Sequence, residues 1–134
     1  MLILERHKEE RVKPKMKSKV IFHSFINSDQ KKELFEKAST LIFPTRYKKE
    51  SFGLVVVKAF SYGIPVRTTD EGSLKSIVNE KSGIVVSNLE NLPNAFENIL
   101  GNFVNKETAK YCRQRYLNNF SLEQFENNLV SLFK

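Results

Sequence analysis

The chain has a single cysteine, Cys112, among its 134 residues. One thiol excludes an internal disulfide and any metal site built from several thiolates. The sequence also has no apolar run long enough to cross a bilayer. Its start, Met-Leu-Ile-Leu-Glu-Arg, lacks the basic region and the longer apolar stretch of a signal peptide. These absences favour a protein of the reducing cytoplasm.

Acidic residues are fewer than basic ones, so the formal net charge is +7, and much of the excess lies in residues 8–19. Such a block attracts anionic lipid or nucleic acid. No aromatic residue is interleaved in it, which argues against binding of single-stranded nucleic acid. We therefore expect a solvated lead-in over residues 1–19, partly helical and without a nucleic-acid partner. Peripheral contact with an anionic face of the inner membrane is the alternative role of this segment.

Short apolar segments alternate with amphipathic ones along the rest of the chain, which we expect to form one domain over residues 20–134. Short apolar strands alternating with helices are typical of an α/β fold with a parallel sheet covered on both faces. We also expect a short polar helix over residues 2–12, before Pro14. Strands are predicted at 19–22, 41–43, 66–69 and 84–86, and helices after Asn27 and at 73–78.

Three further helices are predicted after the last strand, at the end of the sheet. The first two carry the rows Leu89, Leu92, Phe96, Ile99 and Val104, Thr108, Cys112, Tyr116. The third opens at Ser121-Leu-Glu-Gln124, which has the pattern of a capping box. Its apolar face consists of Leu122, Phe125, Leu129 and Leu132.

Residues 52–60 are ambiguous by pattern alone. Three consecutive valines favour a strand. The length of the segment, with Gly63 and Pro65 after it, favours a buried helix, and we choose the helix. Phe52, Val56 and Phe60 are then expected in the core.

An acidic residue, Glu50, stands directly before this helix, and Gly53 provides a turn. A helix start offers free amide groups and the positive end of the helix dipole, and both favour a negatively charged ligand. In an open parallel sheet, ligands bind outside the carboxyl ends of the strands. The loops expected there are 23–28, 44–51 and 69–73, and the Glu50 segment lies in the second. This arrangement suits a phosphorylated ligand.

From about Val20 onward the chain resembles the C-terminal, nucleotide-sugar-binding domain of GT-B-fold retaining glycosyltransferases, the group 1 or family four type. The resemblance implies a Rossmann-like sheet that forms one half of a GT-B architecture. It rests on landmarks in a characteristic order and spacing: Val20-Ile-Phe22, Leu41-Ile-Phe-Pro-Thr45, Glu50-Ser-Phe-Gly-Leu54, Ser61-Tyr-Gly-Ile-Pro-Val66, Thr69-Asp-Glu-Gly72 and Ser82-Gly-Ile-Val-Val86.

The resemblance implies a role for each residue of the motif. Glu50 would be the catalytic-site carboxylate that contacts hydroxyls of the donor sugar. The segment Ser51, Phe52, Gly53, Leu54 would present backbone amides to the sugar and the diphosphate. Ser24 and Phe25 would lie near the base of the nucleotide. The implied substrate is a nucleoside-diphosphate sugar, with no cofactor and no metal.

The chain also departs from the family pattern. Lys58 stands where a second glutamate usually holds the ribose, and a lysine has three donors and no acceptor. We place Lys58 in the donor-binding set, where it would pair with a phosphate, with an exposed surface residue as the alternative. Ser24 replaces a glycine, and Arg67 occupies a strand position that is normally apolar.

The N-terminal acceptor-binding domain of such enzymes is not expected in this chain. The first hypothesis is therefore the donor-binding domain of a retaining hexosyltransferase, with little activity by itself and with a partner domain or chain for the acceptor. The alternative is a degenerate, non-catalytic GT-B-like module that acts in binding or scaffolding.

Overall fold

The structure is a computed structural model that describes residues 2–4, 20–23, 25–49, 51–91 and 103–133. The chain divides into an N-terminal unit, Met1–Ala38, and a C-terminal unit, Ser39–Lys134. The predicted helix with Leu92, Phe96 and Ile99 lies outside the described residues except at its start. There Leu89–Asn91 form the short 3-10 helix η3.

The N-terminal unit contains two parallel strands, β1 (Leu2–Leu4) and β2 (Val20–Phe22), with Leu2 opposite Val20. The prediction of a helix from residue 2 is wrong at its first three residues, because this apolar triplet pairs with another strand. The remainder of that segment lies outside the described residues. Strand β2 is confirmed, but its Ile21 side chain is 52% exposed, whereas a buried strand was expected.

Helix α1 (Ser28–Lys37) begins where the sequence predicts a helix start. The Asn27 Oδ1 accepts a hydrogen bond from the Gln30 backbone N–H at 2.9 Å, and the Asn27 N–H donates to Gln30 Oε1 at 3.0 Å. This reciprocal capping box satisfies two amide groups that a helix start leaves without partners.

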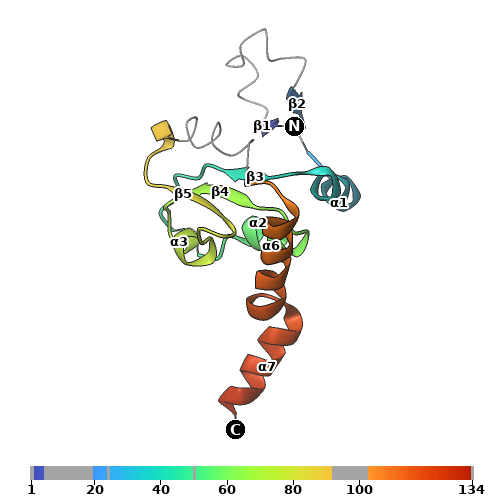
Figure 1. The fold of residues 1–134 in the computed structure, drawn as a ribbon, viewed down its shortest axis with the longest axis vertical. Helices are drawn as coiled ribbons and strands as arrows, with labels where there is room; N and C mark the ends of the chain where they lie inside the picture. The colour runs from blue at the N-terminus through green and yellow to red at the C-terminus, as the bar shows by residue number, and fades with distance from the viewer. Residues whose placement is uncertain (1, 5–19, 24, 50, 92–102, 134) are drawn as a thin grey trace. The chain divides into compact units, whose positions relative to one another are not determined.

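The sheet of the C-terminal unit has three parallel strands in the order β3 (Leu41–Phe43), β4 (Val66–Thr69), β5 (Gly83–Val86). Figure 1 shows β4 between its two neighbours. Leu41 is in register with Val66, and Val66 with Gly83. All four residues of β4 are buried, as expected for the central strand of a covered parallel sheet.

Helices α2 (Leu54–Ser61), α3 (Leu74–Ile77) and α6 (Lys106–Asn119) pack beneath this sheet in Figure 1. The choice of a helix for the valine-rich segment is confirmed. Its inner side supplies much of the core, because Val56, Ala59 and Phe60 are completely buried. The predicted α/β class, a Rossmann-like parallel sheet with flanking helices, is therefore what the chain adopts.

Helix α6 is tied to the ends of the two other helices by arginine side chains. Arg113 donates to the carbonyl of Ser61, the last residue of α2. Arg115 donates to the carbonyls of Ile77 at 2.9 Å and Ser76 at 3.1 Å, at the end of α3. Terminal carbonyls of a helix have no partner within it, so these bonds satisfy acceptors that would otherwise need water.

Two titratable side chains, Arg67 and Cys112, are among the groups buried within this unit. Arg67 on β4 is 1% exposed, and burial lowers the pKa of its guanidinium to about 10. Cys112 on α6 is fully buried, and its Sγ donates to the Ser82 carbonyl at 3.6 Å. Burial raises the pKa of this thiol to about 12. Cys112 is therefore packed in the interior of this unit.

Helix α7 (Leu122–Leu132) follows α6 and points away from the sheet (Figure 1). Its N-cap is Ser121, whose Oγ accepts from the Gln124 N–H at 3.2 Å. The Gln124 side chain donates instead to Asn128 Oδ1 at 3.0 Å, so the Ser121 half of the predicted capping box is the half that is present. The apolar row predicted for this helix exists, but it is exposed to solvent.

Candidate functional site

The start of α2 lies at the edge of the sheet where the strands end. Strands β3 and β4 are parallel and are joined through α2. A helix that connects two parallel strands must begin at the edge where the first strand ends and return to the edge where the second begins. The loops 44–53 and 70–73 therefore share this edge, which is where open α/β sheets bind ligands.

Gly53 sets the direction in which α2 begins. It is the N-cap residue, and its φ of 54° and ψ of 48° are left-handed, a region that glycine enters without a steric penalty. A Cβ at this position would lie 2.7 Å from Leu74 Cδ2, and Leu74 is completely buried. Both the backbone and the close packing of α3 therefore require glycine here.

The first turn of α2 has amide groups that point along the helix axis. The Gly53 carbonyl accepts from the amides of Val56 at 2.8 Å and Val57 at 3.1 Å. The amides before these two belong to the set for which a helix provides no internal acceptor. The first turn contains no acidic residue to offset the positive end of the dipole. An anionic group would be stabilised at this helix start.

Phe52 and Leu54 flank Gly53 and face solvent. Phe52 is 48% exposed and Leu54 is 72% exposed. The Phe52 ring packs edge-to-face against Phe120, with 6.3 Å between ring centroids and 83° between planes. The prediction that Phe52 belongs to the core is wrong, because its ring packs on Phe120 and stays half-exposed. Val56 and Phe60 are core residues, as predicted.

Lys58 lies on the exposed side of α2, one turn after Leu54. Its Nζ is 5.3 Å from the centroid of the Tyr62 ring, a distance at which a cation is attracted to an aromatic face. The structure thus places Lys58 at the surface, on the same helix side as Leu54. A lysine at this place supplies hydrogen-bond donors to a ligand and no acceptor.

Two hydrogen bonds hold the loop between β3 and α2, and Thr45 is the acceptor in both. The Tyr47 N–H donates to Thr45 Oγ1 at 3.1 Å, and Thr69 Oγ1 donates to the Thr45 carbonyl. The following residues are exposed, and three of them are basic: Arg46, Lys48 and Lys49. The loop therefore carries three positive charges in the segment that leads to the start of α2, which favours an anionic ligand.

The predicted roles of several other residues are not tested by the described structure. Glu50, Ser24 and the basic segment 8–19 lie outside the described residues, so their predicted roles stay predictions. Phe25 is 87% exposed in the N-terminal unit, just before α1. Of the predicted set, the structure brings together Ser51, Phe52, Gly53, Leu54 and Lys58.

Two supporting residues were missed by the sequence reading. Leu74 fills the space beside Gly53, and Phe120 holds the Phe52 ring. The sequence contained a weak indication that Leu74 is buried, since it is the first apolar residue of the short helix predicted at 73–78. Phe120 had none, because contacts between distant segments leave no local pattern.

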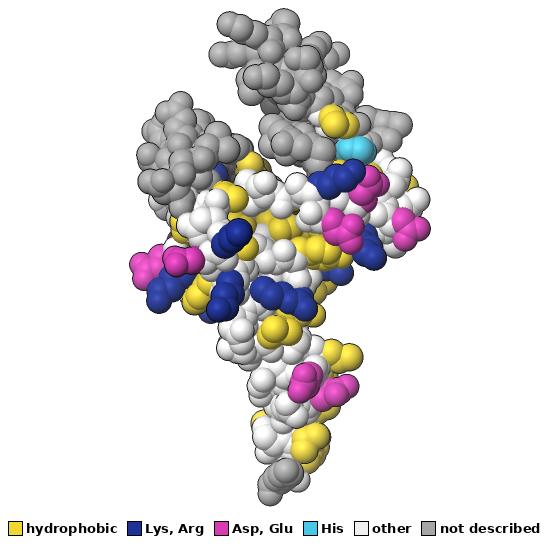
Figure 2. All heavy atoms as spheres, turned by 45° about the vertical axis from the view of Figure 1, so that its right-hand side comes forward, with side chains coloured by type: hydrophobic (Ala, Val, Ile, Leu, Met, Phe, Trp, Pro, Cys, Tyr) yellow, Lys and Arg dark blue, Asp and Glu magenta, His cyan; other side chains and the backbone are white. Residues whose placement is uncertain are grey.

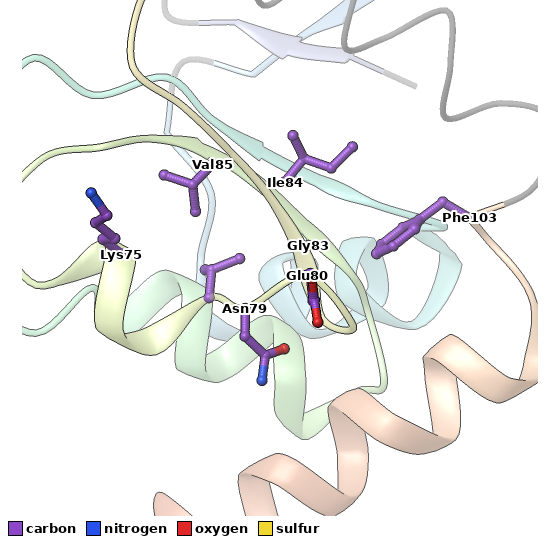
Figure 3. Close-up of a pocket in the computed structure, with 8 residues that line it drawn as sticks. Lys75, Asn79, Glu80, Gly83, Ile84, Val85 and Phe103 are labelled. Carbon is purple, nitrogen blue, oxygen red and sulfur yellow. The ribbon is translucent and has the colours of Figure 1, made fainter.

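A cavity of about 510 Å³ opens elsewhere in the C-terminal unit, along β5 and α3. Figure 3 shows Ile84 and Val85 on β5, Lys75 and Asn79 from the α3 segment, and Phe103 on the opposite side. Its lining contains none of the predicted site residues: Lys75, Val78, Asn79, Glu80, Gly83, Ile84, Val85 and Phe103. The helix start and this cavity are therefore different places on the molecule.

Within the described part of the chain, no three His, Cys, Asp or Glu side chains are grouped so that they could hold a metal ion. Among the same residues, no helix has the length and apolar character that a membrane span requires. The groups described above at the start of α2 are backbone amides, the helix dipole and neighbouring basic side chains.

Comparison with known proteins points to the same class of protein. Residues 4–116 match the family of glycosyl transferases group 1. The chain is 26% identical over 120 residues to an uncharacterized 41.2 kDa protein in the cps region of Klebsiella pneumoniae, covering 88% of the chain and 33% of that protein. It is 29% identical over 122 residues to the alpha-1,3/1,6-mannosyltransferase ALG2 of Dictyostelium discoideum, covering 89% and 29%.

Among solved structures, the sucrose-phosphate synthase of Thermosynechococcus elongatus matches with a TM-score of 0.72 and 26% identity, over 89% of this chain and 30% of that one. The fold is thus that of a Rossmann-like domain of the GT-B type. The chain belongs to the group 1 glycosyltransferase family. It spans about a third or less of the length of these relatives.

Proposed function

We propose that this chain is the donor-binding domain of a retaining hexosyltransferase, which takes a nucleoside-diphosphate sugar. The observation that carries the proposal is the start of α2. At the ligand-binding edge of the sheet, a turn that requires glycine begins a helix that has no side-chain cap and no acidic residue in its first turn. A diphosphate is the part of such a donor that these groups recognise.

In the proposed site the amides that begin near Ser51 face the diphosphate. Negative charge grows on the diphosphate as its bond to the sugar breaks, and fixed dipoles stabilise that charge without rearranging. The Glu50 carboxylate would accept hydrogen bonds from two sugar hydroxyls and so hold the sugar in one orientation. Exposed Phe52 and Leu54 would form the apolar border of this position.

Transfer also requires an acceptor and a site closed to water. In the proposal both come from a domain or partner chain that faces the carboxyl edge of the sheet. Without it the bound donor is open to solvent, which weakens both positioning and electrostatic stabilisation. We therefore propose that this chain binds the donor but transfers sugar slowly or not at all by itself.

Titration calorimetry with uridine and guanosine diphosphates tests donor binding. We expect saturable binding with a dissociation constant between about 10 µM and 1 mM, since one half of a cleft supplies only part of the contacts. Comparison of UDP-glucose with UDP tests the sugar contact. Glu50→Gln should weaken binding of the nucleotide sugar and leave UDP binding nearly unchanged.

Glu107→Gln is the matched control, because it makes the same chemical change at an exposed position near Ala109, which lies against Gly63 just after the far end of α2. Equal weakening by both substitutions would contradict a specific role for Glu50. Absence of saturable binding of any nucleoside diphosphate at 1 mM or above would contradict the donor-binding function itself.

The second candidate function is a non-catalytic binding module, and the position of Lys58 favours it. This side chain lies over Tyr62 and has no carboxylate oxygens for ribose hydroxyls. Lys58→Glu restores an acceptor at this position. A tenfold or larger gain in nucleotide affinity would identify the substitution as the reason for weak binding, whereas no gain would support the non-catalytic module.

A further inference from the structure

One arginine of α6, Arg115, is placed differently from most basic side chains of this protein. Most lysine and arginine side chains among the described residues are exposed, and Figure 2 shows several of them at the surface of the C-terminal unit. Arg115 is only partly exposed, and its guanidinium group contacts both a helix end and an aromatic ring. This side chain is therefore part of the internal contacts of the unit.

The edge of the guanidinium group binds the end of α3. Nε of Arg115 donates to the Ile77 carbonyl at 2.9 Å, and Nη2 donates to the Ser76 carbonyl at 3.1 Å. Helix α3 also borders the glycine that begins α2. A Cβ on Gly53 would lie 2.7 Å from Leu74 Cδ2 and 3.6 Å from Ile77 Cδ1, and both of these side chains are buried. Arg115 is thus fixed to the same helix against which Gly53 packs.

The face of the same guanidinium group lies over the ring of Phe120. Its Cζ is 5.8 Å from the ring centroid, a distance at which a cation is attracted to an aromatic face. The Phe120 ring in turn packs edge-to-face against Phe52, the residue before Gly53. A planar guanidinium group can donate hydrogen bonds from its edge while it stacks through its face, which a lysine ammonium group cannot do. Arg115 therefore joins the two rings to α3.

We propose that Arg115 is a positioning residue for the donor site at the start of α2. Through Phe120 it holds the Phe52 ring at a fixed place relative to α3, and so fixes the backbone that leads into Gly53. The inference rests on the proposed function, in which the amides of this helix start face the diphosphate. Fixed amides stabilise an anion without rearranging, so a small displacement of this backbone weakens binding.

Arg113 on the same helix provides a matched control. Its guanidinium group also donates to a terminal helix carbonyl, that of Ser61, and its Cζ lies 5.4 Å from the centroid of the Tyr116 ring. Ser61 is the last residue of α2, about 10 Å along the axis from the first. The two arginines thus make the same kinds of contact, Arg113 at the end of α2 and Arg115 with the elements that border its start.

Titration calorimetry of Arg115→Lys and Arg113→Lys tests the proposal, with whichever of uridine and guanosine diphosphate the native chain binds more tightly. Both variants keep the charge and lose the guanidinium group, and circular dichroism checks that both are folded. We expect Arg115→Lys to raise the dissociation constant by about threefold to tenfold, and Arg113→Lys by less than about twofold. Equal weakening in the two variants would overturn the proposal, because a general loss of stability would explain it.

A double-mutant cycle with Phe52→Leu tests whether Arg115 acts through the ring. Leucine keeps an apolar side chain at this position and removes the partner of Phe120. In the Phe52→Leu background, Arg115→Lys should change the dissociation constant by less than about twofold, because the ring through which it acts is already absent. If Arg115→Lys weakens binding by the same factor in both backgrounds, Arg115 does not act through Phe52 and the proposal is wrong.

The position of the ring can also be followed without a ligand. The chain contains no tryptophan, so Phe52→Trp provides a single fluorescent side chain at this place. Adding Arg115→Lys should shift its emission to longer wavelength and increase quenching by acrylamide, because the indole ring loses its support. Adding Arg113→Lys should leave both signals nearly unchanged. The same emission and quenching with and without Arg115→Lys would contradict the positioning role.

These measurements separate the inference from the function on which it rests. If the native chain binds neither nucleoside diphosphate, the donor-binding function fails, and a role for Arg115 in it fails as well. If the native chain binds and Arg115→Lys binds equally tightly, the donor-binding function stands and only the role of Arg115 is overturned.

Discussion

Replacement of Gly53 by alanine isolates the feature on which the candidate site depends. Alanine at φ 54° costs about 1–2 kcal/mol relative to glycine, because its Cβ approaches the backbone. The same Cβ would lie 2.7 Å from Leu74 Cδ2, and this leucine is completely buried and has little room to move. Such overpacking costs about 1–3 kcal/mol. The unfolded chain of the variant has less freedom, which offsets about 0.5–1 kcal/mol.

The net expectation is that Gly53→Ala lowers the free energy of unfolding by about 1–4.5 kcal/mol. Urea unfolding followed by circular dichroism measures this change. Gly72→Ala is a matched control, because Gly72 has nearly the same φ of 55° but is exposed. Gly72→Ala should lower the free energy of unfolding only by the cost of the left-handed backbone, about 1 kcal/mol. An equal loss in the two variants would refute the role assigned to Leu74 packing.

Three further predictions concern the support of the site. The pKa of the Cys112 thiol is raised to about 12 in the folded chain, so the unfolded chain loses this proton first, and stability should fall between about pH 9 and pH 12. Urea titrations of the native chain and of Cys112→Ala should therefore diverge above pH 9 and run parallel below it. Phe120→Ala should destabilise the domain by about 1–3 kcal/mol and also weaken nucleotide binding, because Phe52 loses its edge-to-face partner; Phe133→Ala, at the exposed end of α7, should do neither. Arg115→Lys keeps the charge but loses the guanidinium group that donates to the carbonyls of Ser76 and Ile77, so thermal unfolding should show that the free energy of unfolding falls by about 1–2 kcal/mol. A variant as stable as the native chain would contradict a stabilising role for these two hydrogen bonds at the end of α3.

Most of the sheet and its helices could be predicted from local patterns. The strand at 66–69 has the predicted bounds, and the valine-rich segment forms the predicted helix because its length and the following Gly63 and Pro65 outweigh the preference of valine for strands. The error at Leu2–Leu4 has a physical cause. A three-residue apolar segment is too short to show a period, and only its pairing partner makes it a strand.

The site was predicted less completely, because its geometry depends on contacts between distant residues. The position of Gly53 could be predicted, but its left-handed conformation and the exposure of Phe52 could not be derived from the apolar pattern. The packing of Phe52 on Phe120 has no local signal. Similarly, the period of α7 showed which side of the helix is apolar, but it could not show that this side is uncovered.

The contacts made by α6 have a consequence for synthesis of the protein. The ends of α2 and α3 and the ring of Phe52 are held by Arg113, Arg115 and Phe120, which leave the ribosome long after the sheet strands. Nascent chains that stop before residue 106 should thus contain all the strands of the sheet but lack the α6 contacts that fix the start of α2. Ribosome-bound chains should acquire resistance to proteolysis only once Phe120 has emerged from the exit tunnel.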